Sequence, residues 1–206
     1  GGVCGTWSRT GAFVCPVLLG VGADLLVTLP LLSWILKRKN PCHFIRNMSR
    51  ALLTAFSTAS SSATLPVTME CATQQAGVSK RSVDFVLPLG ATINMDGTAI
   101  MQGLATVFIA QMSGIDLTLF QYIQVVLLAV ATSIGTAAVP SAGTITLIII
   151  LQQFNLPLEA IGIILAVDRV LDMIRTSLNV TGDAAIACLV AQSENQLDEN
   201  IFNSTT

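Results

Sequence analysis

The chain has 206 residues, of which 52% are hydrophobic and only 11% are charged, and its mean hydropathy is +0.72. A soluble domain carries about a quarter charged residues, so this composition indicates a membrane protein. The formal net charge of −2 and the 5% aromatic content provide neither a basic surface nor stacking rings, which excludes a nucleic acid as partner.

The first predicted element is a membrane-spanning helix over residues 12–36, which are apolar apart from Asp24 and a few small polar side chains. A crossing needs ~20 residues, and this segment supplies them. A basic run, Lys37 to Lys39, follows it and is expected on the cytoplasmic side of the membrane. The chain should therefore run from outside to inside here.

Residues 44–76 contain two apolar stretches that are each too short to cross a membrane, separated by a serine-rich run at 57–62. The next basic pair, Lys80 and Arg81, should lie on the same cytoplasmic side as the first basic run. Both observations predict a first re-entrant hairpin, which enters the membrane and returns to the side it came from.

Residues 82–112 are long enough to cross, but the sequence Asn-Met-Asp-Gly-Thr at 94–98 predicts an unwound centre. Glycine and proline at 133–143 interrupt residues 118–155, which predicts a second re-entrant hairpin. Residues 157–192 form the last predicted spanning helix, and 193–206 form a polar, frayed tail on the cytoplasmic side.

These elements predict one all-α membrane domain over residues 1–206, in which a hairpin followed by a helix occurs twice with opposite orientation. Inverted repeats of this kind place a substrate near the middle of the bilayer. Irregular backbone at that depth is tolerated only where it is buried in protein or lines a polar cavity. The pattern therefore predicts a binding cavity.

The last predicted helix carries a polar stripe, whose six residues have offsets of 0, 4, 7, 8, 11 and 15 and share one helical face: Asp168, Asp172, Arg175, Thr176, Asn179 and Asp183. Facing lipid, its four charges would cost on the order of 10 kcal/mol, so they must face a polar site. An ion-pair network that only fastens helices is the alternative. It leaves the charges unbalanced, because three aspartates oppose one arginine.

Bound cations would balance this excess of carboxylates, to which Asp96 adds one more. Oxygen ligands and the need to release the ion favour a hard, weakly held cation, for which sodium is the natural candidate. The residues alone do not separate Na⁺ from H⁺.

Three motifs resemble a known family: Ser-Ser-Ser-Ala-Thr-Leu-Pro at 60–66, Asn-Met-Asp-Gly-Thr at 94–98, and Asp-Met-Ile-Arg-Thr followed by Asn-Val-Thr-Gly-Asp across 172–183. In this order they are similar to the excitatory amino acid transporters, which are dicarboxylate/amino acid:cation symporters, over nearly the whole chain. The resemblance implies the transport domain of a homotrimeric elevator transporter for glutamate or aspartate in the cell membrane, in contact with lipid. It implies no enzymatic activity and no organic cofactor, and a scaffold half that lies outside this chain.

The resemblance also assigns residues. It implies that Arg175 binds the side-chain carboxylate of the substrate and Asp172 its amino group, and that the remaining substrate residues are Ser61, Ser62, Thr98, Val139, Gly143, Thr176 and Asn179. Val139 and Gly143 belong to the second hairpin, which should close over the substrate. For Na⁺ it implies one site at Gly90, Asn94, Asn179 and Asp183, another at Thr92, Ser133, Ile134 and Thr136, and a third at Asp96 that is completed by residues outside the chain.

The sequence departs from the family at two points. Its members carry an extra arginine before the serine run or after the substrate-binding aspartate, where this chain has Ala59 and Met173. Arg169 is near, but one residue beyond Asp168 it points about 100° away from the stripe. The proton-carrying glutamate of the animal transporters corresponds to Gln102, which cannot titrate, so we expect no proton or potassium coupling and a closer likeness to archaeal and bacterial members.

Other functions are less well supported by the residues. A serine hydrolase would need a base for Ser60 to Ser62, but the one histidine, His43, falls in the basic loop. A channel also uses broken helices and carbonyl groups, and it stays an alternative. A third possibility is a segment that binds its ligand without transporting it.

Overall fold

The computed structural model describes the backbone of residues 3–35 and 41–203 and the side chains of 11–27 and 42–203. The predicted end of the first helix at residue 36, the basic run at 37–39 and residues 204–206 lie outside this description. The described residues form helices, which confirms the all-α prediction for them: α1 (Val3–Ile35), α2 (Pro41–Asn47), α3 (Ser49–Thr58), α4 (Ser61–Gln74), α5 (Lys80–Ile93), α6 (Asp96–Met112), α7 (Leu119–Ile134), α8 (Ala142–Gln153), the 3₁₀ turn η1 (Leu158–Ala160), α9 (Ile161–Ser193) and α10 (Glu199–Asn203). Among these helices, none combines the length and the apolar character that a membrane crossing requires.

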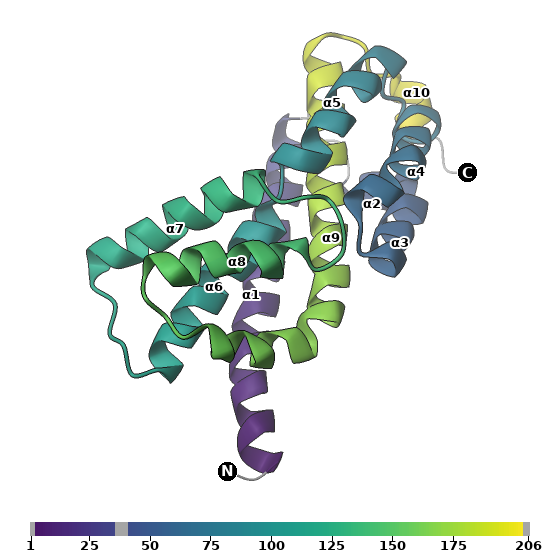
Figure 1. The fold of residues 1–206 in the computed structure, drawn as a ribbon. Coiled ribbons are helices and arrows are strands. Elements are labelled where there is room, and N and C mark those ends of the chain that lie inside the picture. Colours follow the sequence, from purple (N-terminus) through teal and green to yellow (C-terminus); the bar gives the residue numbers. More distant parts are fainter. Residues whose placement is uncertain (1–2, 36–40, 204–206) are drawn as a thin grey trace.

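The helices form two lobes that share α9 (Figure 1). The hairpin-1 lobe consists of α2 to α5, α10 and the second half of α9, packed around an apolar cluster that includes Phe44, Leu87 and Phe202. The hairpin-2 lobe consists of α1, α6 to α8 and the first half of α9, around a cluster that includes Phe13 and Leu147. Because α9 runs through both lobes, its polar stripe lies where they meet.

The segment predicted to unwind is interrupted at two residues, Asn94 and Met95, between α5 and α6. The Asn94 N–H still donates to the Gly90 carbonyl at 2.8 Å, whereas Met95 offers no side-chain cap to α6. A helix end leaves backbone groups without intrahelical partners, so the break presents polar backbone halfway along the segment.

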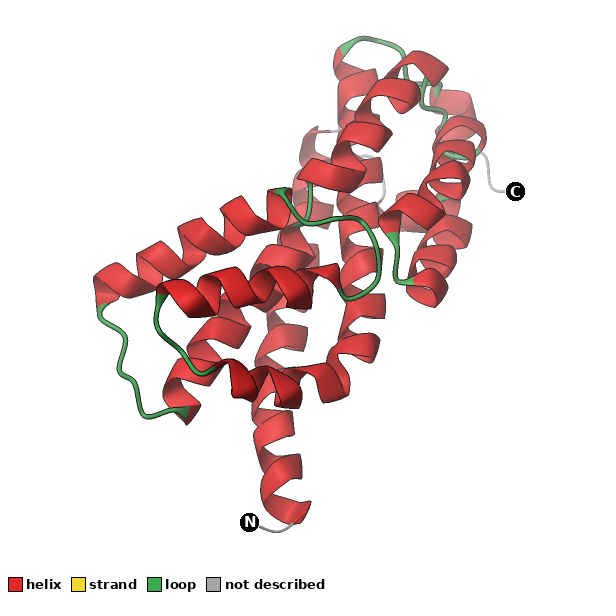
Figure 2. Ribbon diagram, in the orientation of Figure 1, coloured by secondary structure: helices red, strands yellow, loops and turns green. Residues whose placement is uncertain are grey.

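Two antiparallel helix pairs correspond to the predicted hairpins, and their connections differ in length (Figure 2). Ala59 and Ser60 alone join α3 to α4. Ala59 adopts a left-handed conformation with φ of 50°, and Ser60 caps α4 by accepting from the Ala63 N–H at 3.2 Å. Residues 135–141 join α7 to α8 in a longer loop. Whether either pair re-enters a membrane stays a prediction.

The frayed tail expected from residue 193 onward is not observed as far as Asn203. The Asp198 N–H donates to the Gly77 carbonyl at 2.8 Å beside an antiparallel bridge between Val78 and Leu197. Phe202 is 1% exposed, and its carbonyl accepts from the Asn47 side chain at 3.0 Å. The buried Phe202 ring and these backbone hydrogen bonds hold residues 197–202 against the base of the hairpin-1 lobe.

Candidate functional site

A small polar cavity lies where the two lobes meet, between the α3–α4 connection, the break before α6, the α7–α8 connection and α9. Its volume is about 20 Å³. Of the residues predicted to bind substrate, it is lined by Ser61, Thr98, Val139, Gly143, Asp172, Arg175, Thr176 and Asn179. Ser62 is the exception, because its side chain is exposed at the start of α4. Its backbone N–H donates to the Ala138 carbonyl of the α7–α8 connection.

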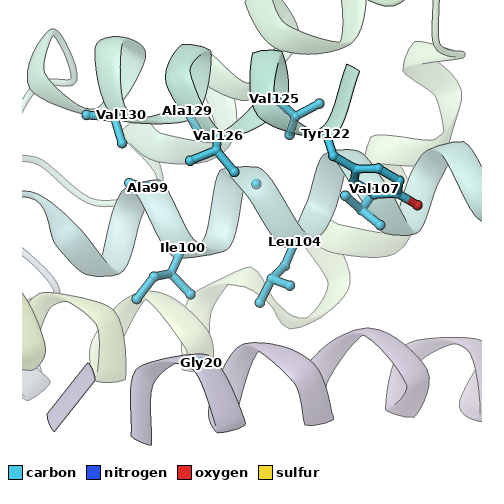
Figure 3. Close-up of a pocket in the computed structure, with 11 residues that line it drawn as sticks. Gly20, Ala99, Ile100, Leu104, Val107, Tyr122, Val125, Val126, Ala129 and Val130 are labelled. Carbon is cyan, nitrogen blue, oxygen red and sulfur yellow. The ribbon is translucent and has the colours of Figure 1, made fainter. Parts of the chain in front are cut away.

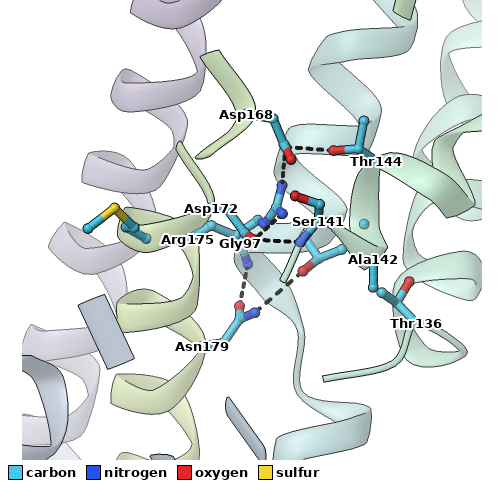
Figure 4. Close-up of polar contacts among 12 residues, drawn as sticks. Gly97, Thr136, Ser141, Ala142, Thr144, Asp168, Asp172, Arg175 and Asn179 are labelled. Carbon is cyan, nitrogen blue, oxygen red and sulfur yellow. Dashed lines mark hydrogen bonds and ion pairs between the residues drawn. The ribbon is translucent and has the colours of Figure 1, made fainter. Parts of the chain in front are cut away.

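A buried ion pair forms the centre of the site (Figure 4). The Arg175 Nη2 donates to the Asp172 Oδ1 at 2.5 Å, and both side chains are at most 5% exposed. The Arg175 Nη1 lies 3.8 Å from the Asp168 Oδ1, which accepts from the Thr144 hydroxyl at 2.6 Å. The polar stripe of α9 therefore faces the protein interior, as its helical spacing predicted.

Two atoms of this cluster have no hydrogen-bond partner in the described structure, the Asp168 Oδ2 and the Arg175 Nη1. A buried donor or acceptor without a partner costs about 1–3 kcal/mol, and more when it is charged. The guanidinium thus keeps an unused donor beside the cavity. A planar guanidinium with a free donor suits a second carboxylate.

Asn179 ties the broken helix to α9. Its Oδ1 accepts from the Gly97 N–H at 2.9 Å (Figure 4). Its Nδ2 donates to the Thr98 hydroxyl at 3.4 Å. A methyl group at Gly97 would lie 2.8 Å from the Arg175 Cγ, so the close approach of α6 to α9 requires a glycine here. The unwound residues are in this way held against the stripe.

Of the residues predicted to bind the first Na⁺, Gly90, Asn94 and Asp183 lie together at the far end of the stripe, whereas Asn179 bonds to the start of α6. The Asn94 Nδ2 donates to the Asp183 Oδ1 at 3.1 Å. A methyl group at Gly90 would lie 2.6 Å from the same oxygen, so Asp183 is in direct contact with α5. Asp183 is 3% exposed and has no arginine or lysine as an ion-pair partner within the described residues. A buried carboxylate in this position leaves negative charge for a cation to balance.

The residues predicted for the second and third sites are brought together less closely. Thr92 is exposed and donates to the Leu89 carbonyl of its own helix at 3.0 Å. Ser133 and Thr136 are buried, and their hydroxyls donate to carbonyls of α7, while the Ile134 side chain is exposed. Asp96 is exposed at the start of α6.

Some polar contacts of the site were not predicted. The Ser141 N–H donates to the Asp172 Oδ2 at 2.7 Å, and the Ser60 hydroxyl donates to the Ala138 carbonyl at 2.8 Å. Backbone groups carry no residue-type signal, so these two contacts could not be read from the sequence. The contact of Thr144 with Asp168 has a signal in the sequence, because Thr144 is a hydroxyl residue within an apolar run.

The structure also shows what accompanies the departures from the family pattern. Ala59 is the left-handed residue of the α3–α4 connection, and Met173 is half-buried. Arg169 is exposed and does not line the cavity. With Ala59 and Met173 at the positions of the extra arginine, the ion-pair partner of Asp172 is Arg175 itself.

A second cavity, of about 420 Å³, lies between α1, α6 and α7 (Figure 3). Its lining is apolar and includes Ile100, Leu104 and Val126, with Tyr122 at one end. Without a charged group it cannot select an acidic ligand. His43, the base that a serine hydrolase would need, lies in α2 and lines neither cavity.

Comparison with known proteins gives a consistent set of relatives. The model of the sodium:dicarboxylate symporter family matches residues 3–193. The chain is 50% identical over 176 residues to excitatory amino acid transporter 3 of Mus musculus, which covers 85% of the chain and 34% of the relative. It is 47% identical over 178 residues to an excitatory amino acid transporter of Caenorhabditis elegans, which covers 86% of the chain and 35% of the relative. The chain therefore spans about a third of the length of these relatives. Both are animal proteins, so they do not support the expected likeness to archaeal and bacterial members.

Proposed function

Because the chain belongs to the sodium:dicarboxylate symporter family, we propose that it binds an acidic amino acid, glutamate or aspartate, together with Na⁺, as the substrate-binding part of a symporter. Symport of an acidic amino acid with sodium is supported at the level of the family and its relatives. A family of transporters is also consistent with a protein that is not an enzyme. The whole protein's transport activity is part of the proposal.

The single observation that carries the proposal is the pair of Arg175 and Asp172 in one buried cavity. The two groups stand one helical turn apart, with opposite charges and few solvent contacts. An acidic amino acid carries a carboxylate and an ammonium group that match them, so the guanidinium would bind the side-chain carboxylate and Asp172 the amino group. A neutral amino acid would leave the guanidinium without this partner.

The small volume of the cavity adds a requirement for movement. About 20 Å³ is close to the space that one water molecule needs, so an amino acid cannot enter unless part of the wall moves. The α7–α8 connection is the part of the wall with exposed residues, including Val139 and Pro140. We therefore propose that this connection opens to admit the substrate and closes over it.

Sodium coupling follows from the charges in the proposal. The buried charged residues in the described part of α9 are three aspartates and one arginine, and the side-chain hydrogen bond of Asp183 is to the Asn94 amide. Carboxylate, amide and backbone oxygens are ligands for a hard cation. We propose Na⁺ at Asp183, Asn94, Gly90 and Asn179, and further Na⁺ at the less complete groups around Ser133 and Asp96.

The location in a cell membrane and the assembly are proposals as well. Large apolar side chains are exposed on α1 and α7, among them Leu26 at 77%, Leu119 at 79% and Leu127 at 65%. Surfaces of this kind are typical of faces that lipid or other protein covers. The family resemblance supports a homotrimer that moves its transport domain by an elevator mechanism, with spanning helices, two re-entrant hairpins and a cytoplasmic C-terminus.

The test is the selectivity of binding after Arg175→Thr. Removal of one partner of a buried charge pair costs about 2–5 kcal/mol, which is about 30-fold to several thousand-fold in affinity. We expect aspartate and glutamate binding to fall by such a factor, and serine binding to change little. Calorimetry would measure the ratio of aspartate to serine affinity, with and without Na⁺.

The matched control is Arg169→Thr, which removes the same charge from an exposed position of the same helix. It should leave the ratio unchanged. A ratio that stays within about twofold of wild type in Arg175→Thr would show that Arg175 is structural. Binding of aspartate by the unchanged chain without dependence on Na⁺ would contradict the sodium coupling.

A further inference from the structure

Gln102 makes hydrogen bonds to both helices of the second hairpin. It lies in α6 and its side chain is 0% exposed. Its Nε2 donates to the Gly143 carbonyl at 3.0 Å and to the Thr146 hydroxyl at 2.7 Å, both in α8. Its Oε1 accepts from the Thr132 hydroxyl of α7 at 2.8 Å. One amide therefore joins three helices.

These bonds reach the two ends of the α7–α8 connection. The Thr146 hydroxyl continues the chain to the Thr136 hydroxyl at 2.9 Å. Thr136, near the start of the connection, and Gly143, just beyond its end, both line the polar cavity. The position of the connection over the cavity is thus coupled to α6 through a continuous series of hydrogen bonds.

A polar residue that merely tolerates burial would bond within its own helix, and α6 provides an example. Thr106 is also 0% exposed, and its hydroxyl donates to the Gln102 carbonyl of the same helix at 2.8 Å. The Gln102 amide instead donates to α8 twice and accepts from α7. Its contacts are therefore those of a residue that fixes neighbouring elements relative to one another.

We infer that Gln102 is a positioning residue, which holds the α7–α8 connection closed against α6 and thereby sets how tightly the site retains its substrate. The inference rests on the proposed function for its effect on binding, but the holding of the connection does not depend on it. If the connection and α8 move away from α6, the buried Gln102 Nε2 loses both of its acceptors, the Gly143 carbonyl and the Thr146 hydroxyl. A buried donor without a partner is unfavourable, so the amide favours the closed position.

The first experiment measures this holding without a substrate. In Gln102→Met, an unbranched apolar side chain of similar length replaces the amide. We expect hydrogen exchange of the backbone amides at 136–146, including Ser141 and Thr144, to become about five- to a hundredfold faster, since the lost bonds stabilised the closed connection. Exchange in the hairpin-1 lobe should not change.

The control is Thr106→Val, which removes a hydroxyl that is equally buried on the same helix. It should leave exchange at 136–146 as in wild type. Thr146→Val removes one acceptor of Gln102 and should give a smaller increase at the same amides, which also serves if Gln102→Met does not fold. Unchanged exchange at 136–146, or an increase spread over the whole chain, would overturn the inference.

The second experiment uses aspartate in the presence of Na⁺. Gln102→Met should raise the dissociation rate of aspartate about five- to a hundredfold while the ratio of aspartate to serine affinity stays as in wild type, because Arg175 is untouched. A variant that is only less stable would not combine a faster dissociation of aspartate with an unchanged ratio of aspartate to serine affinity. If the unchanged chain fails to bind aspartate, the proposed function fails, while the exchange result still decides the role of Gln102.

Discussion

The two helix connections that face the cavity differ in how they are held. The α3–α4 connection has two residues, and Ser60 both caps α4 and donates across to Ala138. The α7–α8 connection has seven residues, and Ser141 at its end makes no side-chain cap for α8. Short length and a satisfied cap restrict backbone motion, whereas the longer connection depends on bonds to other elements. We infer that the first is a fixed wall and the second a movable one.

The two lobes that carry these connections also differ in the contacts that hold them in place. The hairpin-1 lobe is closed at its base by the segment that contains Leu197 and Phe202. In the hairpin-2 lobe, the α7–α8 connection is held by the Gln102 amide, by the contact of Ser141 with Asp172, and by the bonds that the Ala138 carbonyl accepts from the α3–α4 side.

The largest expected effect is on the base of the hairpin-1 lobe. Phe202→Ala removes a fully buried ring, which typically costs about 3–5 kcal/mol of the free energy of unfolding. Thermal and denaturant unfolding in detergent would measure the loss. The control is Phe120→Ala, because Phe120 is 67% exposed on α7 and its removal should cost less than about 0.5 kcal/mol. Equal losses in both variants would mean that the C-terminal segment does not fix this lobe.

An intermediate effect should separate the two connections directly. Ser60→Ala removes the cap of α4 and a donor to Ala138, so we expect a loss of about 1–2 kcal/mol in the free energy of unfolding. Ser141→Ala removes a side chain without a cap bond and should cost less than about 0.5 kcal/mol. Unfolding curves of the two single variants would test the difference. A greater loss in Ser141→Ala would reverse the assignment of fixed and movable walls.

The smallest effect concerns backbone conformation at the same two places. Ser141 adopts a left-handed conformation with φ of 59°, which glycine accepts without the penalty of a Cβ atom. Ser141→Gly should therefore raise the free energy of unfolding by up to about 1 kcal/mol. Ala59→Gly, at φ of 50°, should gain less, because the Ala59 methyl group is buried and is lost. If Ser141→Gly is destabilising, the side chain has a role in the connection that its contacts do not explain.

Much of the arrangement could be predicted because it depends on side-chain pattern. Charged residues at helical spacing in an apolar segment predicted the buried stripe, and Asn94 with Gly97 predicted the break in the preceding helix. Ser62 does not line the cavity, because one residue at a helix start turns the side chain by about 100° relative to Ser61, and its role in substrate binding stays a prediction.

The remaining features depend on contacts that leave little trace in the sequence. The Ser141 N–H and the Ala138 carbonyl are backbone groups that every residue except proline offers in the same form. Two neighbouring apolar residues in a polar tail, Ile201 and Phe202, are too few to show a period, so the packing of this segment could not be predicted. The sequence shows that Gln102 cannot titrate, but its hydrogen bonds to α7 and α8 depend on how the three helices pack.

The bond between Asn47 and Phe202 has a consequence for the order in which the protein is made. The two residues are 155 positions apart, and a ribosome adds about 5–20 residues per second. For roughly 10 to 30 s the nascent chain therefore contains the α2 surface around Phe44 and Met48 before the aromatic ring that covers it has been synthesised. During that interval the apolar surface is available to a chaperone or to the insertion machinery. A nascent chain stalled before Phe202 would keep it exposed.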